Sequence, residues 1–185
     1  MSRKNLFNAF IAIVAIVISF LMAPLLGNDF WVSMLIMLAL NILLTSSLRT
    51  IFILNEISLG HVGFTLIGAY SSALLALKLG LSVWLSMLCG GLLSALVAFA
   101  LGFPFLRTKA MYFSILTFMT AEIFRLITYS WRDFTGGQNG LSNIPHPEPI
   151  TLPLIGEISF KSMTNYYYMT LVVVIISLLL LYSLE

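Results

Sequence analysis

Long uncharged stretches follow one another along the chain, separated by short polar connections. Each stretch approaches the roughly 20 apolar residues that an α-helix needs to cross the hydrocarbon core of a bilayer. Because backbone groups in lipid must form their hydrogen bonds within the protein, the pattern predicts helices in these stretches. Six membrane-spanning helices are expected, at residues 6–26, 30–48, 57–77, 82–103, 110–130 and 162–184.

Composition supports this prediction and excludes other classes of protein. The 185 residues are 60% hydrophobic and only 9% charged, whereas a soluble domain carries about 25% charged residues. A disordered chain would contain few apolar residues, and a net charge of +2 is too small for a nucleic-acid partner. We therefore expect an all-α integral membrane protein that contacts membrane lipid, with a single transmembrane domain over residues 1–185.

The distribution of lysine and arginine predicts which side of the membrane each connection faces. Cytoplasmic connections are enriched in these residues, and tryptophan is enriched at helix ends near the lipid headgroups. A cytoplasmic N-terminus gives the inner side five of them (Arg3, Lys4, Arg49, Arg107, Lys109) and the outer side three (Lys78, Arg132, Lys161). Trp31, Trp84 and Trp131 then all lie at outer helix ends. We expect both termini in the cytoplasm.

The connection between the second and third expected helices is unusual. Its sequence, TIFILNEISLG, starts with an apolar piece too short to cross the membrane and continues into polar residues and glycine. Such a segment is typical of a broken or re-entrant helix, whose backbone is tolerated at depth where protein or a water-filled cavity satisfies it. The candidate pathway residues are Asn55, Glu56, Ser58, Gly60 and His61. The alternative is an interfacial turn followed by a helix whose first turn is capped by Ser58.

Residues 131–161 form a second unusual connection, on the expected outer side. This segment contains four of the six prolines and is too long for a simple connector. Its glycines allow turns with positive φ, and its prolines stiffen the chain that follows. The candidate residues are Thr135, Gly136, Gly137, Asn139 and Gly140. The segment either caps a pathway or receives a partner, or it is a solvated loop without such a role.

The fourth expected helix carries a stripe of small residues. Small side chains at four-residue spacing let two helix backbones approach each other in lipid. The stripe consists of Gly90, Ser94, Ala98 and Gly102. We expect it to be a surface for helix packing.

Glu122 and Arg125 are the charged residues within the fifth expected helix. Their spacing of three places them on one helical face, and ionised groups in lipid are costly unless they are paired or reach water. We expect an intramembrane charge pair. It is either a self-compensating structural pair or part of a pathway or gate.

The residue pattern offers little support for an enzyme. Ser58 and His61 suggest the nucleophile and base of an intramembrane hydrolase, but no Gly-x-Ser-x-Gly elbow accompanies them. No cluster of His, Cys and carboxylates has metal-ligand spacing, and the sequence contains no Walker-type phosphate loop. We therefore expect a protein without catalytic activity of its own that holds no metal.

Four short tracts, taken together, resemble a known family. They are SLGHVGF at residues 58–64, GAY at residues 68–70, FLR at residues 105–107 and TGGQNGL at residues 135–141. In this order and at these separations they resemble the permeases of branched-chain amino-acid ABC importers, in particular the M-type subunit. The resemblance covers residues 41–144.

The resemblance implies a membrane transport subunit of a bacterial cytoplasmic membrane that uses no cofactor itself. Such permeases pair with a second permease subunit and with two cytoplasmic ATPase subunits, which bind and hydrolyse ATP. A periplasmic or extracellular binding protein delivers leucine, isoleucine or valine. On this basis residues 55–61 line or flank the translocation path, and the glycine-rich loop lies near the docked binding protein.

The chain departs from the family pattern in two ways. The tract IFILNE at residues 51–56 is bulkier than in typical members and adds the carboxylate of Glu56, which bears on the identity of the substrate. Typical members are also considerably longer and carry a cytoplasmic segment that engages the ATPase, so we expect a fragment or truncated product. Two alternatives stay open: a related permease for a sugar or another small solute, and a non-transport membrane protein such as a hydrolase or assembly factor.

Overall fold

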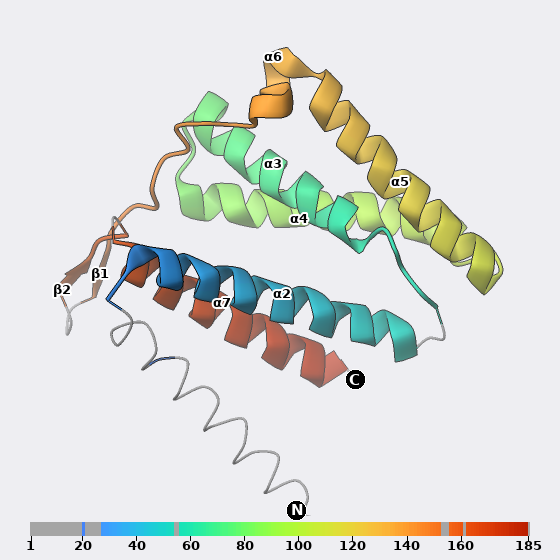
Figure 1. Cartoon of the computed structure of the whole chain (residues 1–185), viewed down its shortest axis with the longest axis horizontal. Helices are drawn as coiled ribbons and strands as arrows, with labels where there is room; N and C mark the ends of the chain where they lie inside the picture. Colours follow the sequence, from blue (N-terminus) through green and yellow to red (C-terminus); the bar gives the residue numbers. More distant parts are fainter. Residues whose placement is uncertain (1–19, 21–26, 54–55, 153–155, 161, 185) are drawn as a thin grey trace, which may run out of the picture. The chain divides into compact units, whose positions relative to one another are not determined.

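The computed structural model describes residues 20, 27–53, 56–152, 156–160 and 162–184 of the chain. Within these residues five long helices form: α2 (Asp29–Ile53), α3 (His61–Leu79), α4 (Val83–Phe105), α5 (Ala110–Ser130) and α7 (Met163–Leu184) (Figure 1). They confirm the prediction of an all-α membrane protein and correspond to five of the six expected spans. Of the first expected helix, at residues 6–26, only residue 20 is described.

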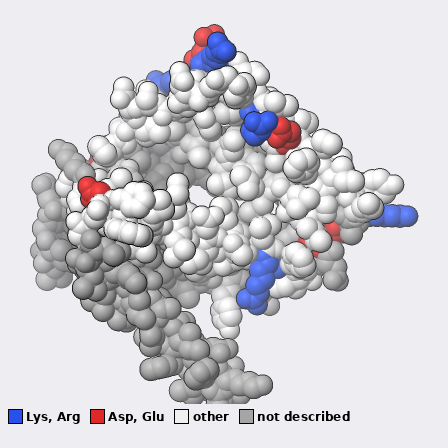
Figure 2. All heavy atoms as spheres, viewed as in Figure 1, with Lys and Arg blue, Asp and Glu red and all other residues white. Residues whose placement is uncertain are grey.

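Each long helix has the length and surface of a membrane span. Their 19–25 residues correspond to about 28–38 Å at 1.5 Å per residue, against a hydrocarbon core of about 30 Å. On α4 the side chains of Leu88, Leu92, Leu96 and Phe99 are 65–77% exposed, which favours contact with lipid over contact with water. The face drawn in Figure 2 is almost uncharged, with charged residues confined to small groups.

The contacts between residues divide the chain into two units, residues 1–43 with 152–185 and residues 44–151. In the first unit the N-terminal part of α2 packs on α7 around the buried side chains of Val32, Tyr167 and Leu171. The Oδ1 atom of Asn28 accepts a hydrogen bond from the N–H of Phe30 at 3.0 Å and so caps α2. The expectation of one domain over residues 1–185 stays a prediction.

The second unit contains α3, α4 and α5, and α3 contacts both of the other helices (Figure 1). At its contact with α4, the backbones come close at Gly90. A β-carbon on Gly90 would lie 2.7 Å from the carbonyl oxygen of Gly68 and 2.9 Å from the amide nitrogen of Ser72. The hydroxyl of Ser94 donates to the carbonyl oxygen of Phe64 at 2.6 Å. This contact therefore depends on residues without bulk and on a partly buried hydrogen bond between the two helices.

The stripe of small residues on α4 is thus used unevenly. Gly90 and Ser94 lie at the contact with α3. Ala98 is half-buried, and no atom lies within 4 Å of the position that a β-carbon on Gly102 would take. The described contacts therefore involve only the first half of the stripe.

The helix boundaries near residues 50–60 differ from the prediction. α2 continues to Ile53 instead of ending at residue 48, because the apolar residues 51–53 prolong the helix. α3 begins at His61 instead of residue 57, and its N-cap position is Gly60, without a side-chain cap hydrogen bond. The alternative in which Ser58 caps this helix is therefore wrong. Residues 56–60, which are not helical, are called the inner segment below.

The connection at residues 131–161 contains short elements that the sequence pattern did not predict. They are α6 (Arg132–Thr135), the 3₁₀ helix η1 (Gly137–Asn139) and the strands β1 (Ile150–Leu152) and β2 (Gly156–Ile158). The two strands pair in one small sheet. Residues 135–141 are called the outer loop below.

Candidate functional site

The inner segment lies against α5 through its backbone. The hydroxyl of Ser114 donates to the carbonyl oxygen of Ile57 at 2.7 Å, and the N–H of Leu59 donates to Thr117 Oγ1 at 3.2 Å. Gly60 lies so close to the backbone of Thr117 that a β-carbon on it would overlap the carbonyl group. These hydroxyls replace the hydrogen bonds that a helix would have formed, which explains how the chain leaves helical geometry here. The amide of Leu59 is therefore engaged by α5.

His61 and Ser58 do not form a catalytic pair. His61 Nε2 and Ser47 Oγ are hydrogen-bonded at 2.5 Å, which joins the start of α3 to α2. Ser58 is buried, at 8% exposure. The Oε2 atom of Glu56 is buried and has no hydrogen-bond partner among the described residues, and Asn55 lies outside them. A role on the substrate path for these five candidate residues stays a prediction.

The outer loop is tied to the end of α5 by the hydroxyl of Thr135. This hydroxyl donates to the carbonyl oxygens of Thr128 and Trp131, at 2.5 and 2.7 Å, and accepts from the N–H of Gly137 at 3.3 Å. Thr135 is itself buried, at 6% exposure. One side chain therefore folds the loop back on the helix that precedes it.

Three glycines set the direction of the outer loop. Gly136, Gly137 and Gly140 have φ angles of +77°, +58° and +66°, in the region that favours glycine. A β-carbon on Gly136 would also overlap the carbonyl group of Gly140, and one on Gly137 would lie 3.1 Å from the carbonyl oxygen of Tyr129. Asn139 completes η1 between these turns. The turns bring residues 137–140 back toward α3 and α5.

Aromatic contacts connect the same region to α3. The ammonium of Lys78, near the end of α3, lies 4.1 Å from the centre of the Phe134 ring, a cation–π distance. Phe134 in turn stacks on Trp131 with ring centres 5.0 Å apart. The indole N–H of Trp84 donates to the carbonyl oxygen of Glu148 at 3.3 Å, which fixes the following extended stretch to the start of α4.

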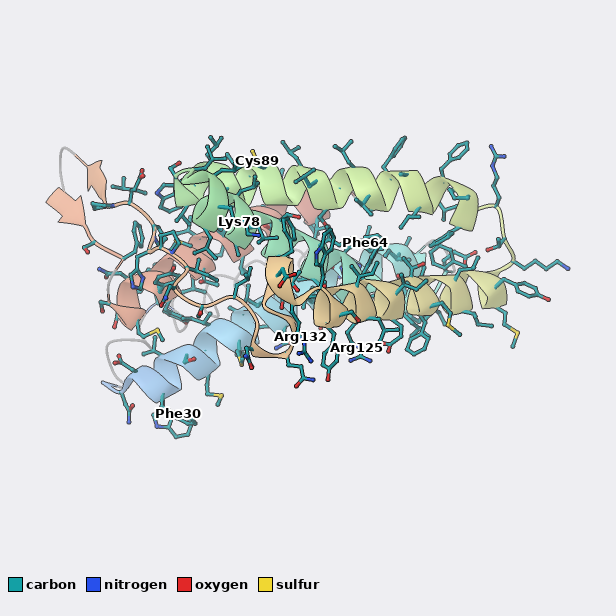
Figure 3. The ribbon with its side chains drawn as sticks, turned by 90° about the horizontal axis from the view of Figure 1, so that it is seen from above. Phe30, Phe64, Lys78, Cys89, Arg125 and Arg132 are labelled. Atoms are coloured by element: carbon teal, nitrogen blue, oxygen red, sulfur yellow. The ribbon has the colours of Figure 1, made fainter. Side chains whose placement is uncertain are left out.

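Glu122 and Arg125 form a bidentate ion pair on α5. Arg125 Nε lies 2.9 Å from Glu122 Oε2, and Arg125 Nη2 lies 2.6 Å from Glu122 Oε1. Their side chains are 39% and 58% exposed, and Figure 3 shows Arg125 projecting from the side of α5 that faces away from α4. The pair holds the guanidinium in a fixed orientation and largely compensates its charge.

A cavity of about 280 Å³ opens between α3, α5 and the outer loop, and we call it the polar cavity. Its lining residues are Leu66, Tyr70, Arg125, Thr128, Tyr129, Gly137 and Gln138. The amide Nε2 of Gln138 donates to the hydroxyl of Tyr129 across this space. The cavity therefore brings together one member of the predicted charge pair and one glycine of the predicted loop.

A second cavity, of about 220 Å³, lies beside it and is called the apolar cavity. Its lining residues are Ala69, Tyr70, Ala73, Leu141 and Ile144. Tyr70 lines both cavities. Residues 137–138 therefore line the polar cavity, and residues 141 and 144, which follow in sequence, line the apolar cavity.

The residues that complete the polar cavity were missed as site residues by sequence reasoning. Tyr70 and Gln138 do belong to the tracts GAY and TGGQNGL. The tracts themselves were therefore the only available signal. Tyr70 and Gln138 come close because the chain turns at Gly136, Gly137 and Gly140. No rule based on sequence spacing predicts the combined direction of these turns.

Comparison with known proteins identifies relatives of the chain. Residues 30–184 match the family described as branched-chain amino acid transport system / permease component. Similar proteins include the high-affinity branched-chain amino acid transport system permease protein LivM of Salmonella typhimurium, 45% identical, and that of Escherichia coli K12, 44% identical, each over 89 residues. These matches cover 48% of this chain and 21% of each relative. No solved structure matches the chain.

Proposed function

Because this chain belongs to the family of branched-chain amino acid transport system permease components, we propose that the full-length protein is the membrane permease of an ATP-driven importer of branched-chain amino acids. The observation that carries the proposal is the family match over residues 30–184. The names of the two LivM relatives support the choice of solute. The family is one of transport subunits and not of enzymes, and a sugar permease or a hydrolase is not favoured.

The proposed partners follow from the energetics of transport. A permease component works with the other components of its transport system. The described residues contain five helices long and apolar enough to cross lipid, and in our proposal ATP is bound and hydrolysed by two cytoplasmic ATPase subunits. A second permease subunit completes the pathway, and a periplasmic or extracellular binding protein delivers the solute. The permease itself needs no cofactor.

The proposed orientation places the outer loop and both cavities on the side from which solute arrives. The protein resides in the bacterial cytoplasmic membrane with both termini inside, and the bias of lysine and arginine supports this orientation. The inner segment then lies toward the cytoplasm and fixes α3 against α5 beside the path. Glu122 and Arg125 lie on the outer half of α5, next to the loop.

Reconstituted transport tests the proposed function. The full-length permease, purified with its second permease and ATPase subunits and placed in proteoliposomes, should take up radiolabelled leucine when the loaded binding protein and ATP are supplied. Unlabelled isoleucine and valine should compete, and ribose and urea should not. The matched control carries an ATPase subunit whose phosphate-loop lysine is replaced, and its uptake should fall to background.

Two results would contradict the proposal. Competition by ribose or urea as strong as that by leucine would assign the permease to another solute. A full-length protein that co-purifies with no nucleotide-binding subunit would exclude an ATP-driven importer.

A further inference from the structure

We infer that the polar and apolar cavities together form a binding site for an amino-acid zwitterion, with the carboxylate at Arg125 and an aliphatic side chain between α3 and residues 141–144. The inference rests on the proposed function, because it assigns to this surface the solute that the importer moves. It also goes beyond that function, since it names the residues that meet the solute on the outer half of the protein.

The polar cavity contains one charged side chain, Arg125, whose charge is compensated by Glu122. Among its lining residues only Arg125 is ionised, and its Nε and Nη2 atoms are bonded to Glu122. A guanidinium carries five N–H donors, so these two bonds orient Arg125 and leave it further donors for a carboxylate. Because the ion pair is neutral overall, a neutral zwitterion suits this cavity better than an anion such as a phosphate.

The other polar groups of this cavity suit the ammonium end of the same ligand. Gln138 uses its amide N–H to bond the hydroxyl of Tyr129, and its amide oxygen is an acceptor. Tyr70 and Tyr129 line the same space, and an aromatic ring attracts a cation placed over it within about 6 Å. An α-ammonium group therefore finds an amide acceptor and two aromatic residues beside the position of its carboxylate.

The apolar cavity restricts the size and polarity of the amino acid's side chain. Its lining carries no charged side chain, and the small side chains of Ala69 and Ala73 leave space opposite Leu141 and Ile144. Tyr70, shared by the two cavities, links the polar end to the apolar end. A sugar would place several hydroxyls against these aliphatic groups, where Tyr70 is the one polar side chain of the lining, and this is unfavourable. A short branched aliphatic side chain meets no such cost.

Ligand protection of a cysteine at Gln138 tests the site. The experiment uses the full-length assembly in proteoliposomes, with Gln138→Cys in a background where Cys89 and any other cysteine are replaced. Leucine should slow labelling by a small maleimide at least about threefold near saturation, by mass action. Leucinamide, which lacks the carboxylate, should protect much less. Ser130→Cys is the control and should not respond, because Ser130 is the exposed last residue of α5 and lines neither cavity.

Two further variants probe the two ends of the ligand separately. Ala73→Leu fills the apolar cavity and should weaken protection by leucine more than protection by alanine. Arg125→Lys keeps the charge for Glu122 but loses the bidentate fork, so protection by leucine should weaken toward that by leucinamide. The Gln138→Cys measurement with native Arg125 remains decisive if either variant fails to accumulate.

The outcomes separate the inference from the proposed function, because leucine uptake is measured both in these vesicles and in matched vesicles with native Gln138, and the native vesicles decide the function. Uptake without protection overturns the site and leaves the function standing. Protection without ATP-driven uptake supports the site and overturns the function, and absence of both overturns both. Protection by the unloaded binding protein, with none by leucine, also overturns the site, because the surface is then a dock for that protein.

Discussion

The inner segment and the outer loop are both irregular stretches supported by α5. They differ in whether they line a cavity. Hydroxyls of Ser114 and Thr117 bond the backbone of the inner segment. At the other end of α5, Thr135 of the loop donates to the carbonyl oxygens of Thr128 in that helix and of Trp131 at its C-cap. No residue of the inner segment lines either cavity, whereas Gly137 and Gln138 line the polar one.

Glycine accounts for much of this difference. Gly60 has a φ of −94°, which any residue can adopt, and it is needed because the backbone of Thr117 leaves no room for a side chain. Gly137 and Gly140 have positive φ and turn the chain toward α3. The same residue type therefore closes a contact at one end and directs a loop over a cavity at the other.

Of the variants that separate the two regions, Gly60→Ala should lower the stability of the protein most. The added methyl group overlaps the backbone of Thr117, which cannot move as a flexible side chain would, so we expect a destabilisation of about 3 kcal/mol, the upper end for overpacking. The midpoint of thermal unfolding in detergent, followed by tryptophan fluorescence, measures it. Gly102→Ala is the control, because no atom lies within 4 Å of its added methyl group. Equal midpoints for the two variants would show that the inner segment is not closed against α5.

Gly90→Ala should have the next largest effect. Its methyl group would meet the backbone of Gly68 and Ser72 at 2.7–2.9 Å, and α3 and α4 can separate slightly, so about 2 kcal/mol is expected. The neighbouring Gly91→Ala, with nothing within 4 Å, should be neutral or stabilising. The same unfolding measurement on both variants checks the prediction. A Gly91→Ala loss as large as that of Gly90→Ala would contradict the α3–α4 contact.

Thr117→Val should have a smaller effect that is confined to the inner segment. The change removes the acceptor of the Leu59 N–H while it keeps the size of the side chain, which costs about 1 kcal/mol. Hydrogen exchange at Leu59 should become faster. Thr120→Val is the matched control, since the Thr120 hydroxyl bonds only within α5 among the described contacts. Unchanged exchange at Leu59 in Thr117→Val would contradict the proposed support.

Gln138→Ala should change stability least, by within about 0.5 kcal/mol, because the residue is exposed. It removes the hydrogen bond to Tyr129 and one polar wall of the cavity. We expect the leucine KM of the reconstituted importer to rise about three- to tenfold, the equivalent of one hydrogen bond. An unchanged KM would remove Gln138 from the site.

Much of the fold could be predicted from the sequence, because the spacing of charges marks spans directly. Five of the expected spans form. Their largest boundary errors lie where apolar residues 51–53 prolong α2 and where α5 bonds the chain before His61, and the other ends differ by at most two residues. The ion pair of Glu122 and Arg125 follows from helical spacing alone. The joining of Arg125, Tyr70 and Gln138 in one cavity could not be predicted, since it depends on the summed turns of the outer loop and on contacts distant in sequence.

The most direct test of the account compares the labelling of a buried and an exposed position in one experiment. The buried position is Ser58→Cys in the inner segment, and the exposed one is Gln138→Cys in the outer loop. Labelling of a buried thiol requires local opening, so Gln138→Cys should react at least about tenfold faster than Ser58→Cys. Only Gln138→Cys should slow when leucine is added. A Ser58→Cys that reacts as fast and is protected by leucine, beside an unprotected Gln138→Cys, would place the solute at the inner segment and contradict the account.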